Sequence, residues 1–185
     1  MKQKISTSIR KTNEKNLTAE QLTQTLAYAG FILVAFELVK SMIVSPIRAF
    51  YQDITFCEGV PFKSFNEDVS FRHKNQFEAC LLYLRDFMKV IDSKDISTIQ
   101  SLRKHRNEIA HNLPQTLKIL EIKENLNLLE ETDKVLFKLS NYRTYMEIGA
   151  DPDFQNLGIE WDTIKGPEYI LFEEIINNLK LMKST

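Results

Sequence analysis

A mostly apolar segment, Ala27–Val44, constrains the fold of this chain more than any other feature. Upstream, Thr18 and Gln21 match a capping box, in which a hydroxyl and an amide satisfy backbone N–H groups reciprocally at a helix start. We therefore predict a helix from Thr18 to about Ser45, where Pro46 would stop it. Because its middle is apolar on nearly every side, this helix belongs either at the centre of a bundle or in a membrane.

Two charged residues in this segment, Glu37 and Lys40, favour the bundle. A free transmembrane helix would carry both charges into hydrocarbon at a high cost in free energy. Residues 1–16 are polar and basic, lack the apolar middle of a signal peptide, and are expected to form a flexible leader. The cysteines Cys57 and Cys80 show no CxxC spacing, which fits a reducing compartment. We expect a soluble, cytoplasmic protein with no membrane partner.

The composition is that of a globular helical protein. The chain has 185 residues, of which 43% are hydrophobic and 26% charged, and only five are Gly and five Pro. A turn-rich sandwich or barrel needs more Gly and Pro at regular intervals. The formal net charge of -1 gives no case for a protein that coats duplex nucleic acid, although a local binding site remains possible.

Apolar residues at three- and four-residue steps predict four more helices. The first is expected over 77–91, and the second from Asp95 or Ser97 to Asn112, just before Pro114. The third is expected over Glu124–Glu147. The fourth starts at Pro167 and has its apolar residues on one side: Ile170, Leu171, Ile175, Leu179 and Met182. With no confident strand, the chain is predicted to be an all-α bundle of five or six helices. We place the bundle at 17–148, an acidic surface excursion at 149–166 and a C-terminal helix at 167–185 that packs on the bundle.

The helix that ends near Asn112 carries the most informative group of residues. At about 100° per residue, its apolar arc contains Ile99, Leu102, Ile109, Ala110 and Leu113. Arg106 falls inside that arc, so it needs a partner, a ligand or an oligomer interface. Asn107 and His111 share one side of the helix at a spacing of four, with Arg103 on the same row. Arg106 and His111 are about 140° apart, so two copies of the helix at a two-fold axis would unite both pairs.

These residue types suggest phosphoryl transfer. The unperturbed pKa of histidine lies near physiological pH, so His111 suits proton transfer. The planar guanidinium of Arg106 matches phosphate oxygens. RNA supplies its own nucleophile, the 2′-hydroxyl, so one His and one Arg suffice for strand cleavage. The three histidines, His73, His105 and His111, show no metal-ligand pattern, and the chain has no P-loop, so no cofactor or metal is expected.

The segment Arg106–His111, with the sequence RNEIAH, resembles the Arg-x4–6-His signature of the HEPN superfamily. The resemblance implies a metal-independent RNA endonuclease of a toxin–antitoxin, abortive-infection or other phage-defence system. It implies a homodimer with a composite active site, RNA as substrate, and a cognate antitoxin or defence-system protein as a further partner. By this resemblance Arg106 contacts the phosphate, His111 transfers the proton or positions the hydroxyl, and Asn107 orients His111 or the substrate.

Several alternatives remain open. The same fold can serve as a non-catalytic module that binds a protein or nucleic acid, and the acidic segment Glu147–Glu168 can cover a basic partner. Glu37 is expected to pair with Arg106 or, on its own helix, with Lys40. The run Arg103, Lys104, His105 is either a phosphate-attracting rim or a solvated face. We assign the twelve Phe residues to core and dimer packing rather than to base stacking.

Overall fold

The computed structural model describes residues 18–53, 63–119, 122–149, 151–155 and 157–184, so the predicted leader over 1–16 lies outside the described residues, as does Cys57. Its elements are α1 (Ala19–Asp53), α2 (Phe65–Asp68), α3 (Gln76–Asp86), α4 (Ser93–Ile119), α5 (Ile122–Ile148), α6 (Pro152–Gln155) and α7 (Pro167–Ser184), with 3₁₀ turns at Ser70–Arg72 and Trp161–Thr163. Over these residues the structure is all-α, as predicted.

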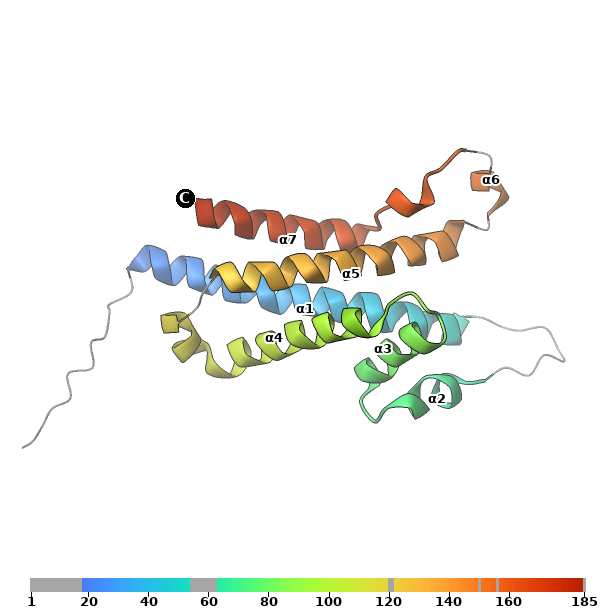
Figure 1. Cartoon of the computed structure of the whole chain (residues 1–185), viewed down its shortest axis with the longest axis horizontal. Coiled ribbons are helices and arrows are strands. Elements are labelled where there is room, and N and C mark those ends of the chain that lie inside the picture. The colour runs from blue at the N-terminus through green and yellow to red at the C-terminus, as the bar shows by residue number, and fades with distance from the viewer. Residues whose placement is uncertain (1–17, 54–62, 120–121, 150, 156, 185) are drawn as a thin grey trace, which may run out of the picture.

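The apolar helix α1 forms the centre of the bundle. In Figure 1 it runs between α5 and α7 on one side and α3 and α4 on the other, and it packs against all four. Its inward residues, Tyr28, Ile32, Ala35 and Val39, are completely buried. By length and composition α1 is also the one described helix that is both long and apolar enough to cross a membrane, a property that core helices of bundles share.

The start of α1 agrees with the prediction, but its end does not. The Thr18 backbone N–H donates to Gln21 Oε1, and the Gln21 N–H donates to Thr18 Oγ1, so the capping box is present. We expected Pro46 to stop the helix, yet α1 continues to Asp53. An internal proline costs about 3 kcal/mol. Packing beyond it offsets that cost, since Ile47 is buried and the Tyr51 hydroxyl contacts Asp68.

The helix predicted over 77–91 is shorter than expected. The helix α3 ends at Asp86, and Lys89 adopts a left-handed conformation with a φ of 56°. The Met88 N–H donates to the Tyr83 carbonyl five residues back, and the Val90 N–H donates to the Leu84 carbonyl six residues back, so the turn satisfies carbonyls of the last helical turn. Ile91 is buried as predicted, but it reaches the core from the connection to α4 rather than from a helix face.

The helix α4 is longer than predicted at both ends. It begins at Ser93, because Asp92 and Asp95 exchange side-chain and backbone hydrogen bonds of 2.8 and 3.1 Å in the manner of a capping box. Asp95 is buried and accepts hydrogen bonds from Lys138 of α5, which joins the two helices at this end. We expected the helix to stop before Pro114, but it continues to Ile119.

The helices α5 and α7 match the predicted segments, with one correction to a buried face. The inward residues of α7 are Tyr169, Phe172, Ile175, Ile176 and Leu179. Ile170 and Leu171, which we expected on the buried side, are each 45% exposed. The helical repeat explains this result, because a face centred on Phe172 and Ile176 turns positions 170 and 171 toward solvent.

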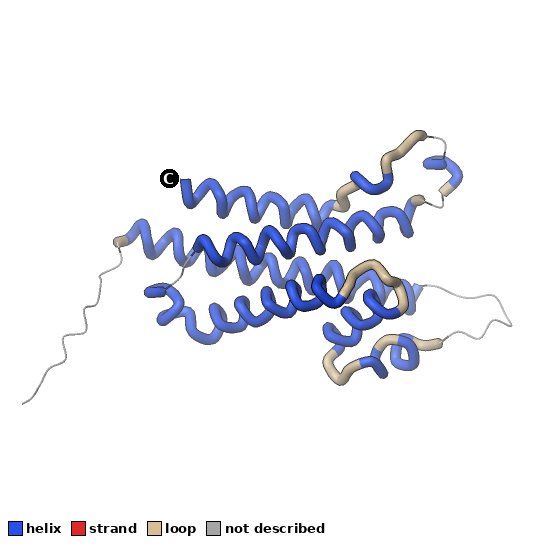
Figure 2. Tube along the Cα trace, in the orientation of Figure 1, coloured by secondary structure: helices blue, strands red, loops and turns tan. Residues whose placement is uncertain are grey.

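The acidic connection between α5 and α7 folds back on α5. Asn141 donates to the carbonyl of Trp161, the Trp161 ring packs edge-on against Tyr145, and the Gly166 N–H donates to Ser140 Oγ at 2.7 Å. Figure 2 shows that the described loops gather toward one end of the bundle, which also holds the α3–α4 connection. The predicted site lies along α4, away from the acidic connection.

Candidate functional site

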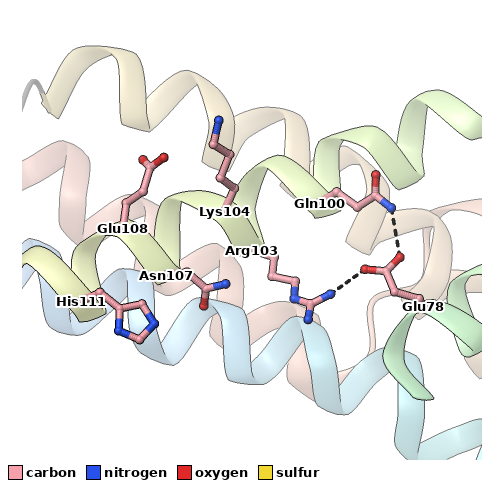
Figure 3. Close-up of a pocket in the computed structure, with 7 residues that line it drawn as sticks. All are labelled: Glu78, Gln100, Arg103, Lys104, Asn107, Glu108 and His111. Carbon is pink, nitrogen blue, oxygen red and sulfur yellow. Dashed lines mark hydrogen bonds and ion pairs between the residues drawn. The ribbon is translucent and has the colours of Figure 1, made fainter. Parts of the chain in front are cut away.

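One side of α4 opens onto a surface cavity of about 390 Å³, which we call the α4 pocket. Its lining residues are Glu78, Gln100, Arg103, Lys104, Asn107, Glu108 and His111 (Figure 3). Four of the predicted site residues, Arg103, Lys104, Asn107 and His111, therefore meet at one cavity. Arg106 and His105 are not among the lining residues.

The helical repeat explains why these residues gather. Residues 100, 103, 107 and 111 follow one another at steps of three or four, and residue 104 lies four positions after 100, so their side chains lie in neighbouring rows on one face. In Figure 3, Lys104 and Glu108 extend to one side of α4, whereas Arg103, Asn107 and His111 extend to the other. His111 is solvent-exposed and Asn107 is half-buried, so the imidazole is accessible to a large ligand.

Glu78 of α3 is a site residue that the sequence analysis missed. Its two carboxylate oxygens accept hydrogen bonds from Arg103 Nη1 at 2.6 Å and from Gln100 Nε2 at 3.0 Å. Glu78 has no sequence signal of its own, because it lies 25 positions before Arg103 on a different helix. The ion pair fixes Arg103 at the edge of the pocket and offsets part of its charge.

Arg106 lies on the other side of α4, in a second surface cavity of about 410 Å³ lined by Leu33, Val34, Glu37, Leu38 and Arg106, which we call the Arg106 groove. Arg106 Nη2 is 3.4 Å from Glu37 Oε1, so Arg106 is one of the two expected partners of Glu37. Glu37 also lies 3.4 Å from Lys40, the other expected partner. Arg106 Nε is buried and makes no hydrogen bond. The guanidinium therefore has unused donor capacity next to an open apolar surface.

Two contacts link the α4 pocket to the Arg106 groove. Arg106 Nη1 donates to Asn107 Oδ1 at 3.2 Å, so Asn107 contacts Arg106 while it lines the pocket with His111. Beneath them, the rings of Phe36 and Phe77 meet edge-on at 5.7 Å. The Arg103 guanidinium lies 5.8 Å from the Phe77 ring, and that of Arg106 lies 5.6 Å from the Phe36 ring. A buried aromatic pair thus supports both arginines.

His105 has a different environment from the one expected for a phosphate-binding rim. Its side chain turns toward α1, where Nε2 lies 3.0 Å from the Tyr28 hydroxyl. Burial lowers the pKa of His105 below its usual value, while nearby Glu108 acts in the opposite direction. A neutral His105 with its proton on Nδ1 accepts a hydrogen bond at Nε2 from the Tyr28 hydroxyl. The structure therefore places His105 at the α1–α4 contact.

Within one chain, Arg106 and His111 do not share a cavity. The helix places them on opposite sides, as the rotation of about 140° between them predicts. In the described part of the chain, no group of three or more His, Cys, Asp and Glu side chains is gathered as potential metal ligands. Comparisons with protein-family models, with curated proteins and with solved structures found no match to this chain.

Proposed function

We propose that this protein is a metal-independent RNA endonuclease of the HEPN type that acts as a homodimer. The observation that carries the proposal is the α4 pocket, a cavity of about 390 Å³ that is lined by His111, Asn107 and Lys104. Arg106 is hydrogen-bonded to Asn107. This volume lies within the usual range for ligand sites. The resemblance of the segment Arg106–His111 to the HEPN signature adds the reaction type, a toxin–antitoxin or phage-defence context, and a cognate cytoplasmic partner.

The proposed reaction uses the substrate's own hydroxyl group. His111 accepts the proton of a ribose 2′-hydroxyl, and the resulting oxygen attacks the adjacent phosphorus. The P–O5′ bond breaks and the 5′ oxygen takes up a proton, which leaves a 2′,3′-cyclic phosphate and a 5′-hydroxyl. Arg106 holds the phosphate oxygens as negative charge accumulates on them. Asn107 orients the imidazole or the substrate.

The ion pair of Arg106 is compatible with this role. Glu37 is 53% exposed and its contact with Arg106 is 3.4 Å long. An exposed pair of this kind contributes about 0–1 kcal/mol. A phosphate group, which offers bidentate acceptors and full charge, therefore replaces Glu37 at little cost.

A second copy of the chain would bring Arg106 and His111 together. The outer face of α1 leaves Leu22, Leu26 and Val34 between 39% and 50% exposed, and Val34 lines the Arg106 groove. An apolar strip of this kind on a helix suits burial against another protein surface. Two-fold contact along it would place two α4 helices near one another, each with one Arg106 and one His111.

The proposal is tested by incubating the purified protein with total RNA in EDTA and analysing both fragments and end groups. We expect cleavage with cyclic or 3′-phosphate ends and 5′-hydroxyls. His111→Ala should abolish cleavage and relieve toxicity on expression, whereas His73→Ala, which alters an exposed histidine outside the pocket, should leave both unchanged. If the folded, dimeric wild type cleaves no RNA with or without divalent cations, the nuclease proposal is wrong.

A second candidate function is a non-catalytic helical module that binds a partner protein or nucleic acid. The observation in its favour is that both arginines already have carboxylate partners, Arg103 in Glu78 and Arg106 in Glu37. In this function Arg106 stabilises the dimer. Arg106→Ala would then weaken dimerisation in sedimentation experiments, whereas the nuclease proposal expects a larger effect on cleavage than on dimerisation.

A further inference from the structure

Four planar groups stack on one another at the end of the molecule formed by α2, α3 and the 3₁₀ turn Ser70–Arg72. The Arg72 guanidinium carbon lies 4.9 Å from the Phe71 ring centre and 5.5 Å from that of Tyr83. The Tyr83 ring in turn stacks on Phe87, with 5.0 Å between centres and 21° between planes. We call Phe71, Arg72, Tyr83 and Phe87 the aromatic platform.

The two outer members of the aromatic platform are open to solvent. Phe71 is 66% exposed and Phe87 is 59% exposed, whereas Tyr83 between them is 3% exposed. Phe71 contacts Arg72 and Phe87 contacts Tyr83 through ring faces, so exposed ring surface remains at each end. Single exposed apolar side chains are common on protein surfaces, whereas exposed rings that belong to one stack are candidates for a binding surface.

The inner members of the platform are held in place. Arg72 Nε donates to the Asp68 carbonyl at 2.8 Å, and its terminal nitrogens lie 3.7 Å from Asp68 Oδ1 and 3.9 Å from Asp86 Oδ2. The Tyr51 hydroxyl lies 2.6 Å from Asp68 Oδ2 and 3.1 Å from the Tyr83 hydroxyl. These contacts order the stack before any ligand arrives, which reduces the entropic cost of binding.

Charged side chains of both signs surround the platform, including the exposed Glu67 of α2, and two of the cations can meet a polyanion. Among the residues from 70 to 90, the exposed charged side chains are Lys74, Asp86 and Lys89. Asp86 is already engaged by Arg85 through hydrogen bonds of 2.6 and 3.1 Å. Lys74 and Lys89 therefore remain available to a phosphate backbone that passes over the rings.

We propose that the aromatic platform binds single-stranded RNA by stacking unpaired bases on Phe71 and Phe87. Every base has a π face, so aromatic rings beside cations bind single strands with little sequence preference. The choice of RNA rests on the proposed function, but the stacking itself does not require cleavage. Tyr83 and Glu78 lie on the same helix, α3, and Glu78 lines the α4 pocket. The platform and the α4 pocket are therefore connected through one helix, with Tyr83 and Glu78 five positions apart on it. This role revises the expectation that the Phe residues serve packing alone.

The test measures binding of a fluorescent, unstructured single-stranded RNA by anisotropy, in EDTA and in the His111→Ala background so that the probe stays intact. We expect Phe71→Ala with Phe87→Ala to weaken binding at least tenfold. The ring-preserving pair Phe71→Tyr with Phe87→Tyr should retain the affinity. Leu181→Ala, which removes a hydrophobic side chain that is 65% exposed on α7, is the matched surface control. Circular dichroism and thermal melting confirm that each variant folds.

Two further probes separate stacking from other contacts. An abasic strand of equal length should bind the wild type and the double alanine variant alike, because it offers no bases. In the Trp161→Phe background, Phe87→Trp supplies one indole whose fluorescence the RNA should quench. Single-stranded DNA of the same sequence tests whether the sugar matters.

The outcomes distinguish this inference from the proposed function. Equal RNA affinity of the double alanine variant and the Leu181→Ala control, or absence of quenching, overturns base stacking and leaves a protein-docking role for the rings. Absence of single-strand binding by the wild-type platform also overturns it. If the RNA binds through the platform but the wild type never cleaves it, the stacking inference stands and the nuclease proposal fails.

Discussion

The two sides of α4 place neighbouring residues in different environments. Arg106 lies over a buried aromatic ring beside Glu37, with one nitrogen enclosed, whereas His111 is exposed at the α4 pocket. Asn107, one residue after Arg106, lies on the same side of α4 as His111. Its hydrogen bond with Arg106 connects the two sides of the helix. The difference teaches that a short motif in a sequence need not form a single site in one chain. Here the helix places Arg106 in one cavity and His111 in another.

The largest effect on stability is expected on the core side of α4. Leu102 is completely buried between the helices, so Leu102→Ala should lower the free energy of unfolding by about 2–5 kcal/mol. Lys104→Ala, two positions away on the pocket side, should change it by less than about 0.5 kcal/mol. Urea denaturation measures both. Similar losses for the two variants would contradict the division of α4 into a core side and a pocket side.

A smaller effect is expected for the ion pair in the Arg106 groove. In a double-mutant cycle of Arg106→Ala and Glu37→Ala, the coupling in unfolding free energy should be about 1 kcal/mol or less and should shrink as salt is added. The reason is that both side chains are partly exposed, at 30% and 53%. A coupling above about 2 kcal/mol that persists in salt would identify Arg106 as mainly a structural residue.

The smallest expected effect concerns pH and His105. Burial holds the pKa of His105 below its unfolded value of about 6.5, so the unfolded state binds the proton more readily. The resulting contribution to stability is complete above about pH 6.5 and decreases as the pH falls toward the folded-state pKa. His105→Gln should remove this part of the pH dependence between pH 7.5 and 5.5, as measured by urea midpoints. Tyr28→Phe tests the hydrogen bond separately. A wild-type pH profile identical to that of His105→Gln would contradict the assignment.

Local chemistry made several elements predictable from the sequence. The capping residues Thr18 and Gln21 located the start of α1, and Pro167 located the start of α7. Proline positions misled the prediction at helix ends, because α1 continues past Pro46 and α4 past Pro114. Tertiary packing decides whether a proline interrupts a helix, and a single sequence does not contain that packing. The same holds for the end of α3, after which the chain turns through the left-handed Lys89.

The candidate site was predictable to the extent that it depends on one helix. The periodicity of α4 placed Asn107 and His111 together and Arg106 apart, and the structure has this arrangement. Contacts between distant segments were harder to predict. Glu37 was found because a carboxylate inside an apolar helix needs a cation. Glu78 gave no such signal, since its contacts depend on how α3 packs against α4. The Phe71–Phe87 platform depends on how the turn Ser70–Arg72 folds against α3, and its sequence pattern does not specify that packing.

The buried pair of Phe36 and Phe77 lies beneath both the α4 pocket and the Arg106 groove, so a change in one can affect the other. Protein interiors are close-packed, so a shift of one ring must be accommodated by the ring it touches. A ligand that draws Arg103 away from Phe77 changes the surface on which Phe36 rests, and Phe36 supports Arg106. A ligand that displaces Arg103 would therefore change the packing beneath the arginine on the opposite side.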